Sequence, residues 1–181
     1  MTTAAVAVKT SWAVDASHSN VEFAVKHLMI ATVRGRFYDV TGTVELDPED
    51  PAKSAIDVTI NAVSIDTRQD QRDGHLRSAD FFDVANFPVL AFKSTRIRRD
   101  GDDFLVDGDL TIRGVTKPVT LRATEEGRTR DPWGGERIGF SASSKINRRD
   151  FGLTWNQVLE AGGFAVGDEV KITVDVELVK Q

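Results

Sequence analysis

Apolar and polar residues alternate one by one along much of this chain. The clearest run is VKITVDVELV, which places on one face the side chains of Val170, Ile172, Val174, Val176 and Leu178. Successive side chains of a β-strand point to opposite faces, so this pattern predicts a strand with one buried and one wet face. The same alternation predicts seven further strands, within residues 20–27, 40–46, 55–62, 88–95, 103–112, 119–123 and 137–143.

Short turn-forming segments separate several of these runs, among them DPEDP, RRDGDD, RGVTKP and DPWGGE. Gly, Asp and Pro favour turns, and short connections between successive strands imply antiparallel neighbours. Eight antiparallel strands, each with one apolar face, form either a closed barrel or a sandwich. Closure removes exposed sheet edges, and eight strands leave room for side chains or one small ligand.

Two segments interrupt the alternation. Residues 66–83 contain good helix formers, and Asp66 or Thr67 has the oxygen that can cap a first helical turn. Gly74 weakens a helix here by roughly 1 kcal/mol relative to alanine. We therefore expect one or two short helices, inserted between the third and fourth strands. Residues 154–169 are expected to form a loop, with room for a helical turn.

The face predicted to point inward mixes phenylalanines with unusually small residues. The small ones are Gly42, Ala62, Gly108, Ala123 and Ala142. Glycines in strands often mark bulges or tight curvature, which explains Gly42 and Gly108 as well as a lumen does. The alanines are better explained by open space, because a solid core favours large aliphatic residues. We favour a lumen suited to an apolar guest.

Composition and charge limit the classes of partner that the protein is expected to bind. The chain has 181 residues, a net charge of −5 and no cysteine. An acidic surface disfavours binding to nucleic acid. The sequence contains no run of about 18 apolar residues, so no integral membrane segment is predicted. We expect a flexible lead over residues 1–10 and one domain over 11–181. The lead has no basic region and too weak an apolar run for a secretory signal, so a cytoplasmic location is expected.

The residues with catalytic potential form no recognisable motif. His18, His27 and His75 lack metal-site spacing, and no nucleotide- or cofactor-binding motif occurs, so we predict no metal, cofactor or catalytic residue. Phe81, Phe82 and Phe87 are too many large apolar residues for a solvated loop. We expect residues 66–88 to cover one end of the barrel as a plug or lid.

Several motifs together resemble the YceI-like family of polyisoprenoid-binding proteins. They are WAVDASHSNVEFAVKH at 12–27, VRGRF at 33–37, SIDTRQDQRDGHLRSADFFDVANFPVLAFKS at 64–94, VDGDLTIRGVTKPVTL at 106–121 and INRRDFGL at 146–153. The resemblance implies an all-β fold, an eight-stranded antiparallel up-and-down barrel like that of lipocalins. It implies a bound polyprenyl chain or isoprenoid quinone and a possible homodimer.

The resemblance and the alternation together assign a lining and an entrance. The lining falls on Phe23, Val25, Ile60, Phe92, Phe104, Val106, Phe140, Ala142 and Val174. The entrance falls near Phe81, Phe82 and Trp155.

Three hypotheses follow. The first is a non-enzymatic carrier that holds one long-chain isoprenoid lipid in the barrel. The second is an enzyme acting on an apolar substrate, with His27 or His75 as acid or base. The third is a filled structural or stress-related barrel dimer.

Overall fold

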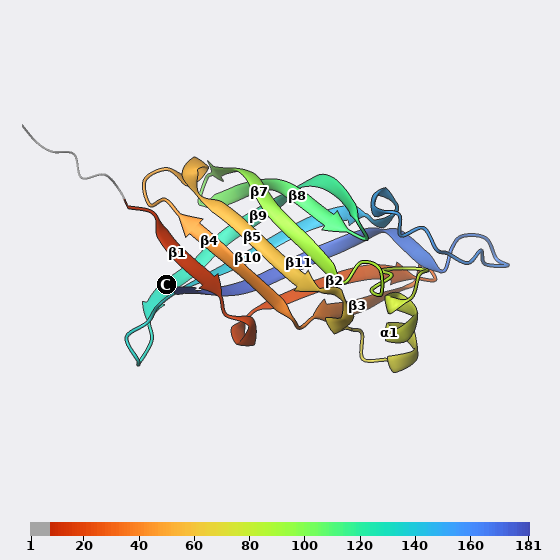
Figure 1. Ribbon diagram of the computed structural model, residues 1–181. Helices are drawn as coiled ribbons and strands as arrows, with labels where there is room; N and C mark the ends of the chain where they lie inside the picture. The colour runs from red at the N-terminus through yellow and green to blue at the C-terminus, as the bar shows by residue number, and fades with distance from the viewer. Residues whose placement is uncertain (1–7) are drawn as a thin grey trace, which may run out of the picture.

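The protein is a long β-barrel (Figure 1), seen in a computed structural model that describes residues 8–181. Residues 1–7 of the predicted lead lie outside this range, and the first strand already begins at Thr10. The strands are β1 (Thr10–Val14), β2 (Asn20–His27), β3 (Ala31–Phe37), β4 (Val40–Leu46), β5 (Ala55–Asn61), β6 (Ile65–Asp66), β7 (Val89–Asp100), β8 (Asp103–Ile112), β9 (Val115–Arg130), β10 (Glu136–Asn147) and β11 (Val166–Lys180).

Two pairs of these strands act as single bent strands. β1 and β2 both pair with β11, one at each of its ends, and β4 and β3 continue the sheet on their other side. The bend between β1 and β2 is a short 3-10 helix, η1 (Ala16–His18), which Asp15 caps by accepting a hydrogen bond from the Ser17 amide (3.0 Å). A kinked strand can therefore belong to the ring along its whole length.

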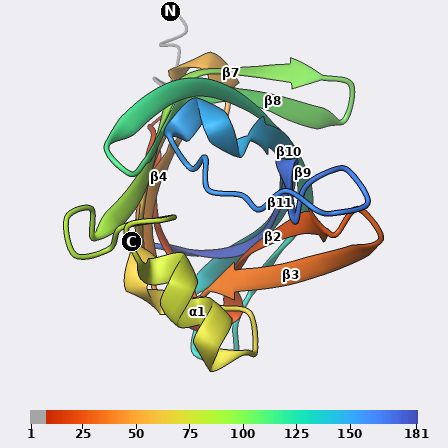
Figure 2. The ribbon, with the colours of Figure 1, turned by 90° about the vertical axis from the view of Figure 1, so that its right-hand side faces the viewer.

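Counted in this way, eight antiparallel strands close a ring in chain order: β1–β2, β3–β4, β5, β7, β8, β9, β10 and β11. Figure 2 looks along this ring from the end that carries the helix. The predicted eight-stranded up-and-down barrel is confirmed, and each predicted strand matches one strand or half of a bent one. β6 is a two-residue addition that pairs with β3.

The alternation failed to reveal β1 and β3. β1 is only five residues long, and β3 carries Gly35 at the centre of its inward face. A Cβ atom at Gly35 would lie 2.4 Å from Cζ of Phe23, so the ring of Phe23 takes the space that a side chain would need. Because Gly35 has no apolar side chain, the alternation along β3 is interrupted, and the pattern did not predict this strand.

The helical insertion lies where it was expected, between β5 and β7, but its cap differs. α1 (Asp70–Arg77) is capped by Gln69, whose side chain accepts from the Arg72 amide. The predicted caps have other partners: the Thr67 amide donates to buried Asp73 (2.9 Å), and Asp66 accepts from the Arg68 amide (2.7 Å). The remaining short 3-10 helices are η2 (Pro51–Lys53), η3 (Ala62–Ser64) and η4 (Arg148–Phe151).

The loop after η4 contains no helical turn and crosses the end of the barrel seen in Figure 2. Between residues 8 and 181, the only α-helix is eight residues long, and no helix has the length and apolar character needed to cross a bilayer.

Candidate functional site

The barrel encloses a cavity of about 380 Å³. Inward-facing side chains such as Phe23, Phe104, Phe140 and Val174 line it, yet they are only half-buried. In a solid core, side chains in these positions would be in contact on all sides. Their remaining accessible surface shows that the interior is hollow, and the cavity is larger than the smallest ligand pockets of about 300 Å³.

Most of the residues predicted to bind a ligand line this cavity. They are Phe23, Val25, Ile60, Phe81, Phe82, Phe92, Phe104, Val106, Phe140, Ala142 and Val174. Trp155 does not line it and instead packs against Phe81, with ring centroids 5.4 Å apart. That these residues bind a ligand remains a prediction. Strands β1 and β3, which were not predicted, add Val14 and Phe37 to the wall.

The small inward residues have different roles. A Cβ atom at Gly108 would lie 2.4 Å from Cζ of Phe92, so this glycine makes room for the ring. A register shift in β7 beside Ser94 adds the curvature that was the alternative explanation. Ala62 is buried in η3 outside the cavity, whereas Ala123 and Ala142 do line it.

One end of the barrel is closed by packed apolar side chains. Phe81, from the segment after α1, is 5% exposed and belongs to a cluster that also contains Phe37, Ala62, Ile65, Leu90, Ile112, Phe151 and Leu153. Leu76 of α1 and Phe82 pack against this cluster. Residues 66–88 therefore form a plug, and the entrance predicted near Phe81, Phe82 and Trp155 is filled rather than open.

A buried arginine ties the loop after η4 to the start of β11. Arg148 is 4% exposed, and burial lowers the pKa of its guanidinium. All five of its N–H groups donate hydrogen bonds. The acceptors are the carbonyl oxygens of Leu153 (2.7 Å), Trp155 (2.9 Å), Gly167 (2.8 Å) and Val166 (3.2 Å), and a carboxylate oxygen of Asp168 (3.4 Å). Arg148 lines the cavity but has no donor left for a ligand.

The cavity reaches the surface at the opposite end, where the β4–β5 loop meets the ends of β7 and β9. We call this opening the mouth, and it is lined by exposed Pro48, Arg99 and Arg128 and by half-buried Asp47, Ser54 and Glu125. Glu125 accepts two hydrogen bonds from Arg128 (2.6 and 3.0 Å), which lower the pKa of its carboxyl. The site thus combines an apolar interior with a charged opening.

Few other ionisable groups approach the cavity. In the described part of the chain, the full set that lines it is Glu22, Asp47, Arg99, Glu125, Arg128, Arg148 and Asp175. His27 and His75 are absent from it. His75 faces Asp80 (2.7 Å) and lies edge-on to the Trp155 ring, on the outside of the plug. The geometry gives no support to a histidine acid or base acting on a substrate inside the barrel.

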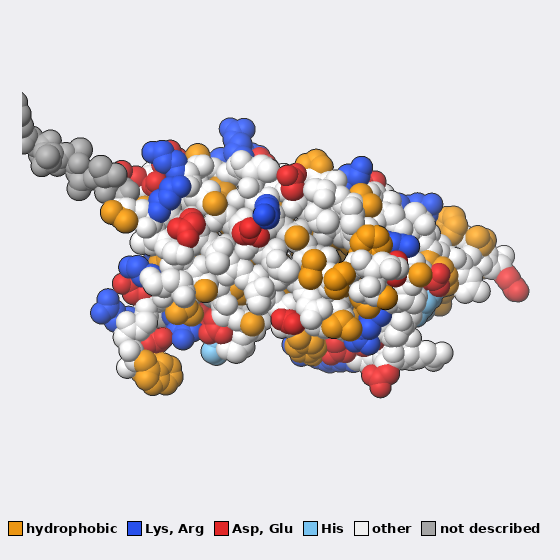
Figure 3. Space-filling model, viewed as in Figure 1, with side chains coloured by type: hydrophobic (Ala, Val, Ile, Leu, Met, Phe, Trp, Pro, Cys, Tyr) orange, Lys and Arg blue, Asp and Glu red, His pale blue; other side chains and the backbone are white. Residues whose placement is uncertain are grey.

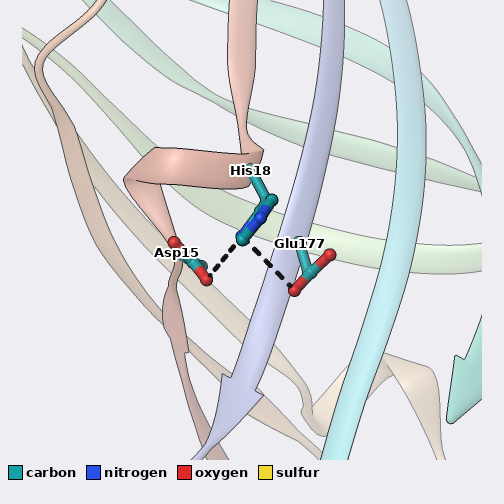
Figure 4. Close-up of side chains that lie close together, drawn as sticks. All are labelled: Asp15, His18 and Glu177. Carbon is teal, nitrogen blue, oxygen red and sulfur yellow. Dashed lines mark hydrogen bonds and ion pairs between the residues drawn. The ribbon is translucent and has the colours of Figure 1, made fainter. Parts of the chain in front are cut away.

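A second polar group on the barrel wall joins Asp15, His18 and Glu177 (Figure 4). His18 Nδ1 lies 3.0 Å from Asp15 Oδ2, and this hydrogen bond raises the pKa of His18. Arg137 donates to Asp15 (2.9 Å) and to Glu177, so a cation already neutralises both carboxylates. Hydrogen bonds from Ser17, His18 and Arg137 hold the pKa of Asp15 well below its usual range. This cluster fixes the bend at η1 to β11.

The outer surface carries charges of both signs (Figure 3), as expected for the polar faces of the strands. Apolar side chains are exposed together at the closed end, on the β2–β3 turn and on the loop before β11. They are Leu28, Met29, Ile30, Val158 and Phe164. A backbone hydrogen bond from Leu28 to Ala165 (2.9 Å) joins the two segments.

Comparison with known proteins identifies the family of this chain. The sequence model of the YceI-like domain family matches residues 12–178. The chain belongs to the YceI-like family. It is 42% identical over 183 residues to Protein YceI from an Escherichia coli strain, an alignment that covers 100% of this chain and 93% of that protein. The resemblance seen in the sequence motifs is confirmed.

Two solved structures show the same fold. Burkholderia cenocepacia BcnA superimposes with a TM-score of 0.79 at 25% identity, covering 91% of this chain and 98% of that one. A polyisoprenoid-binding domain from Saccharophagus degradans superimposes with a TM-score of 0.67, covering 95% of this chain and 99% of that domain. At 18% identity, the second likeness establishes the fold alone.

Proposed function

We propose that this YceI-like protein is a non-enzymatic carrier that holds one long-chain isoprenoid lipid, of the polyprenyl or isoprenoid quinone type, in its barrel. The observation that carries the proposal is the hollow apolar interior, closed by the plug at one end and open at a charged mouth. The Saccharophagus domain with the same fold is a polyisoprenoid-binding domain, which supports this ligand class.

The size of the cavity is sufficient for useful affinity. At about 30 Å³ per methylene-sized group, the volume of one water in the liquid, a cavity of about 380 Å³ holds about a dozen such groups. Burial at ~0.8 kcal/mol each gives roughly 10 kcal/mol of gross stabilisation. Loss of translational and chain freedom removes several kcal/mol, which leaves affinities of about micromolar or tighter for a chain that fills the space.

A series of prenyl alcohols of increasing chain length tests the proposal. We expect affinity, measured by calorimetric titration, to rise with each isoprene unit and then to level off once the cavity is full. Organic extraction of the purified protein, followed by mass spectrometry, should yield a prenyl lipid.

The carrier function would be refuted if the purified protein carried no lipid and bound no member of the series. A flat dependence on chain length would place binding outside the cavity. Homodimer formation and a cytoplasmic location remain predictions, and neither is needed for this function.

A further inference from the structure

Three arginines line the cavity, and two of them already have partners within the protein. Arg148 donates all of its hydrogens at the closed end, and Arg128 forms a two-pronged ion pair with Glu125 at the mouth. Arg99 makes no side-chain hydrogen bond or ion pair with any residue from 8 to 181. It is therefore the one lining arginine whose guanidinium has no hydrogen-bonding or ion-pair partner among these residues.

The fold places Arg99 at the boundary between the apolar wall and solvent. It follows buried Ile97 by two positions on the inward face of β7, immediately before the turn into β8. Its Cζ lies 4.9 Å from the ring centroid of Phe104, the residue with which it is paired across the strands. Because Phe104 lines the cavity, the guanidinium lies where the polar end of a bound amphiphile would emerge.

The guanidinium of Arg99 has no carboxylate partner among the described residues of the mouth. Arg99 and Arg128 contribute two positive charges there, and Glu125 and Asp47 contribute two negative charges, but Glu125 is paired with Arg128. The carboxylate of Asp47, on the β4–β5 side of the mouth, accepts hydrogen bonds from the amides of Glu49 (3.0 Å) and Asp50 (2.9 Å) rather than from Arg99. A guanidinium with unused N–H groups pairs with oxyanions through two parallel hydrogen bonds.

We propose that Arg99 binds the headgroup of the lipid and selects a chain that ends in an oxyanion over one that ends in a neutral alcohol. This inference rests on the proposed carrier function, and it specifies the ligand class at the mouth. Either a phosphate or a carboxylate supplies the required pair of oxygens.

Three ligands with the same chain test this selection: geranylgeranyl phosphate, geranylgeranoic acid and geranylgeraniol. We expect the protein to bind one or both anions about 10- to 100-fold more tightly than the alcohol, as for hydrogen bonds to charged groups. The Arg99→Gln variant should lose this preference and bind the alcohol as before. A preference for the phosphate or for the acid alone identifies which headgroup fits.

The matched control is Arg96→Gln, which removes the same charge from the exposed outer face of the same strand. It should retain the full preference, which separates a local contact from a general loss of positive charge. Equal binding of all three ligands by the unaltered protein, or a preference that survives in Arg99→Gln, would overturn the role of Arg99 and leave the carrier intact. Failure of all three to bind would overturn the carrier as well.

Discussion

Replacing Ala142 with phenylalanine tests whether the lipid chain occupies the space inside the barrel. Ala142 lies on β10 between Ala123 and Val174, faces the cavity and is only half-buried. A phenyl ring added there enters space that no side chain occupies. The variant therefore removes volume from the cavity without displacing the wall.

The expected loss follows from the volumes. A benzene-sized ring takes about 150 Å³, which is about 40% of the cavity of about 380 Å³. About five methylene-sized groups of the lipid lose their place, at ~0.8 kcal/mol each, for an upper limit of about 4 kcal/mol. Because part of the chain can shift toward the mouth, we expect about half of this, a roughly 30-fold weaker affinity for geranylgeraniol.

Calorimetric titration measures the affinity, and a thermal melt checks the fold. The melting temperature should not fall, since the ring fills a void rather than crowding a packed core. The control is Ser143→Phe, which adds the same ring one residue away on the exposed outer face. Unchanged affinity in a folded Ala142→Phe variant would show that the guest binds elsewhere.

Four further substitutions test other parts of the structure. Arg148→Met leaves four carbonyl oxygens without their donor, so we expect a loss of about 3–5 kcal/mol in the free energy of unfolding, measured by urea denaturation. A loss below about 1 kcal/mol would contradict the stabilising role of Arg148. Gly108→Val should cost roughly 1–3 kcal/mol because its Cβ meets the Phe92 ring, whereas Gly74→Ala, with open space around it, should gain up to ~1 kcal/mol. The raised pKa of His18 adds stability that is present below its unfolded value of 6.5 and is lost as pH rises through the folded value. Melts from about pH 5 to about pH 9 should show that loss, and His18→Gln should remove it.

The period-two pattern was enough to predict most strands and their buried faces, because it depends on one property, the side to which each residue points. It allowed a barrel or a sandwich, and the resemblance to the YceI-like family indicated the barrel. The ends of strands were harder to predict. The fourth and sixth predicted strands stopped at residues 95 and 123, whereas β7 and β9 continue to Asp100 and Arg130. In β7 a register shift between Ser94 and Arg96 interrupts the alternation before Ile97, and the inward positions after Ile97 and Ala123 are the charged residues Arg99 and Glu125. A strand prediction based on apolar alternation ends where the barrel wall becomes polar, so it did not include the residues of the mouth.

Other features depended on contacts between distant residues. Gly108 and Gly35 have no local signal that distinguishes space for a neighbouring ring from an open lumen. Thr67 has the chemistry of a cap, but buried Asp73 takes its amide, and Gln69 caps the helix instead. Of the three phenylalanines before β7 that were expected to be buried, Phe81 is buried and Phe82 and Phe87 are half-buried. Their number could not distinguish a filled plug from an entrance.

Because the plug closes one end of the barrel, a lipid enters and leaves through the mouth, and this fixes the order of its movement. A lipid longer than the cavity must enter with its apolar end first and leave with its headgroup first, so that the headgroup stays outside while the chain is bound. A lipid donor and a lipid acceptor would then have to bind the same face of the protein in turn. Each could contact the headgroup while the apolar chain stays inside the cavity.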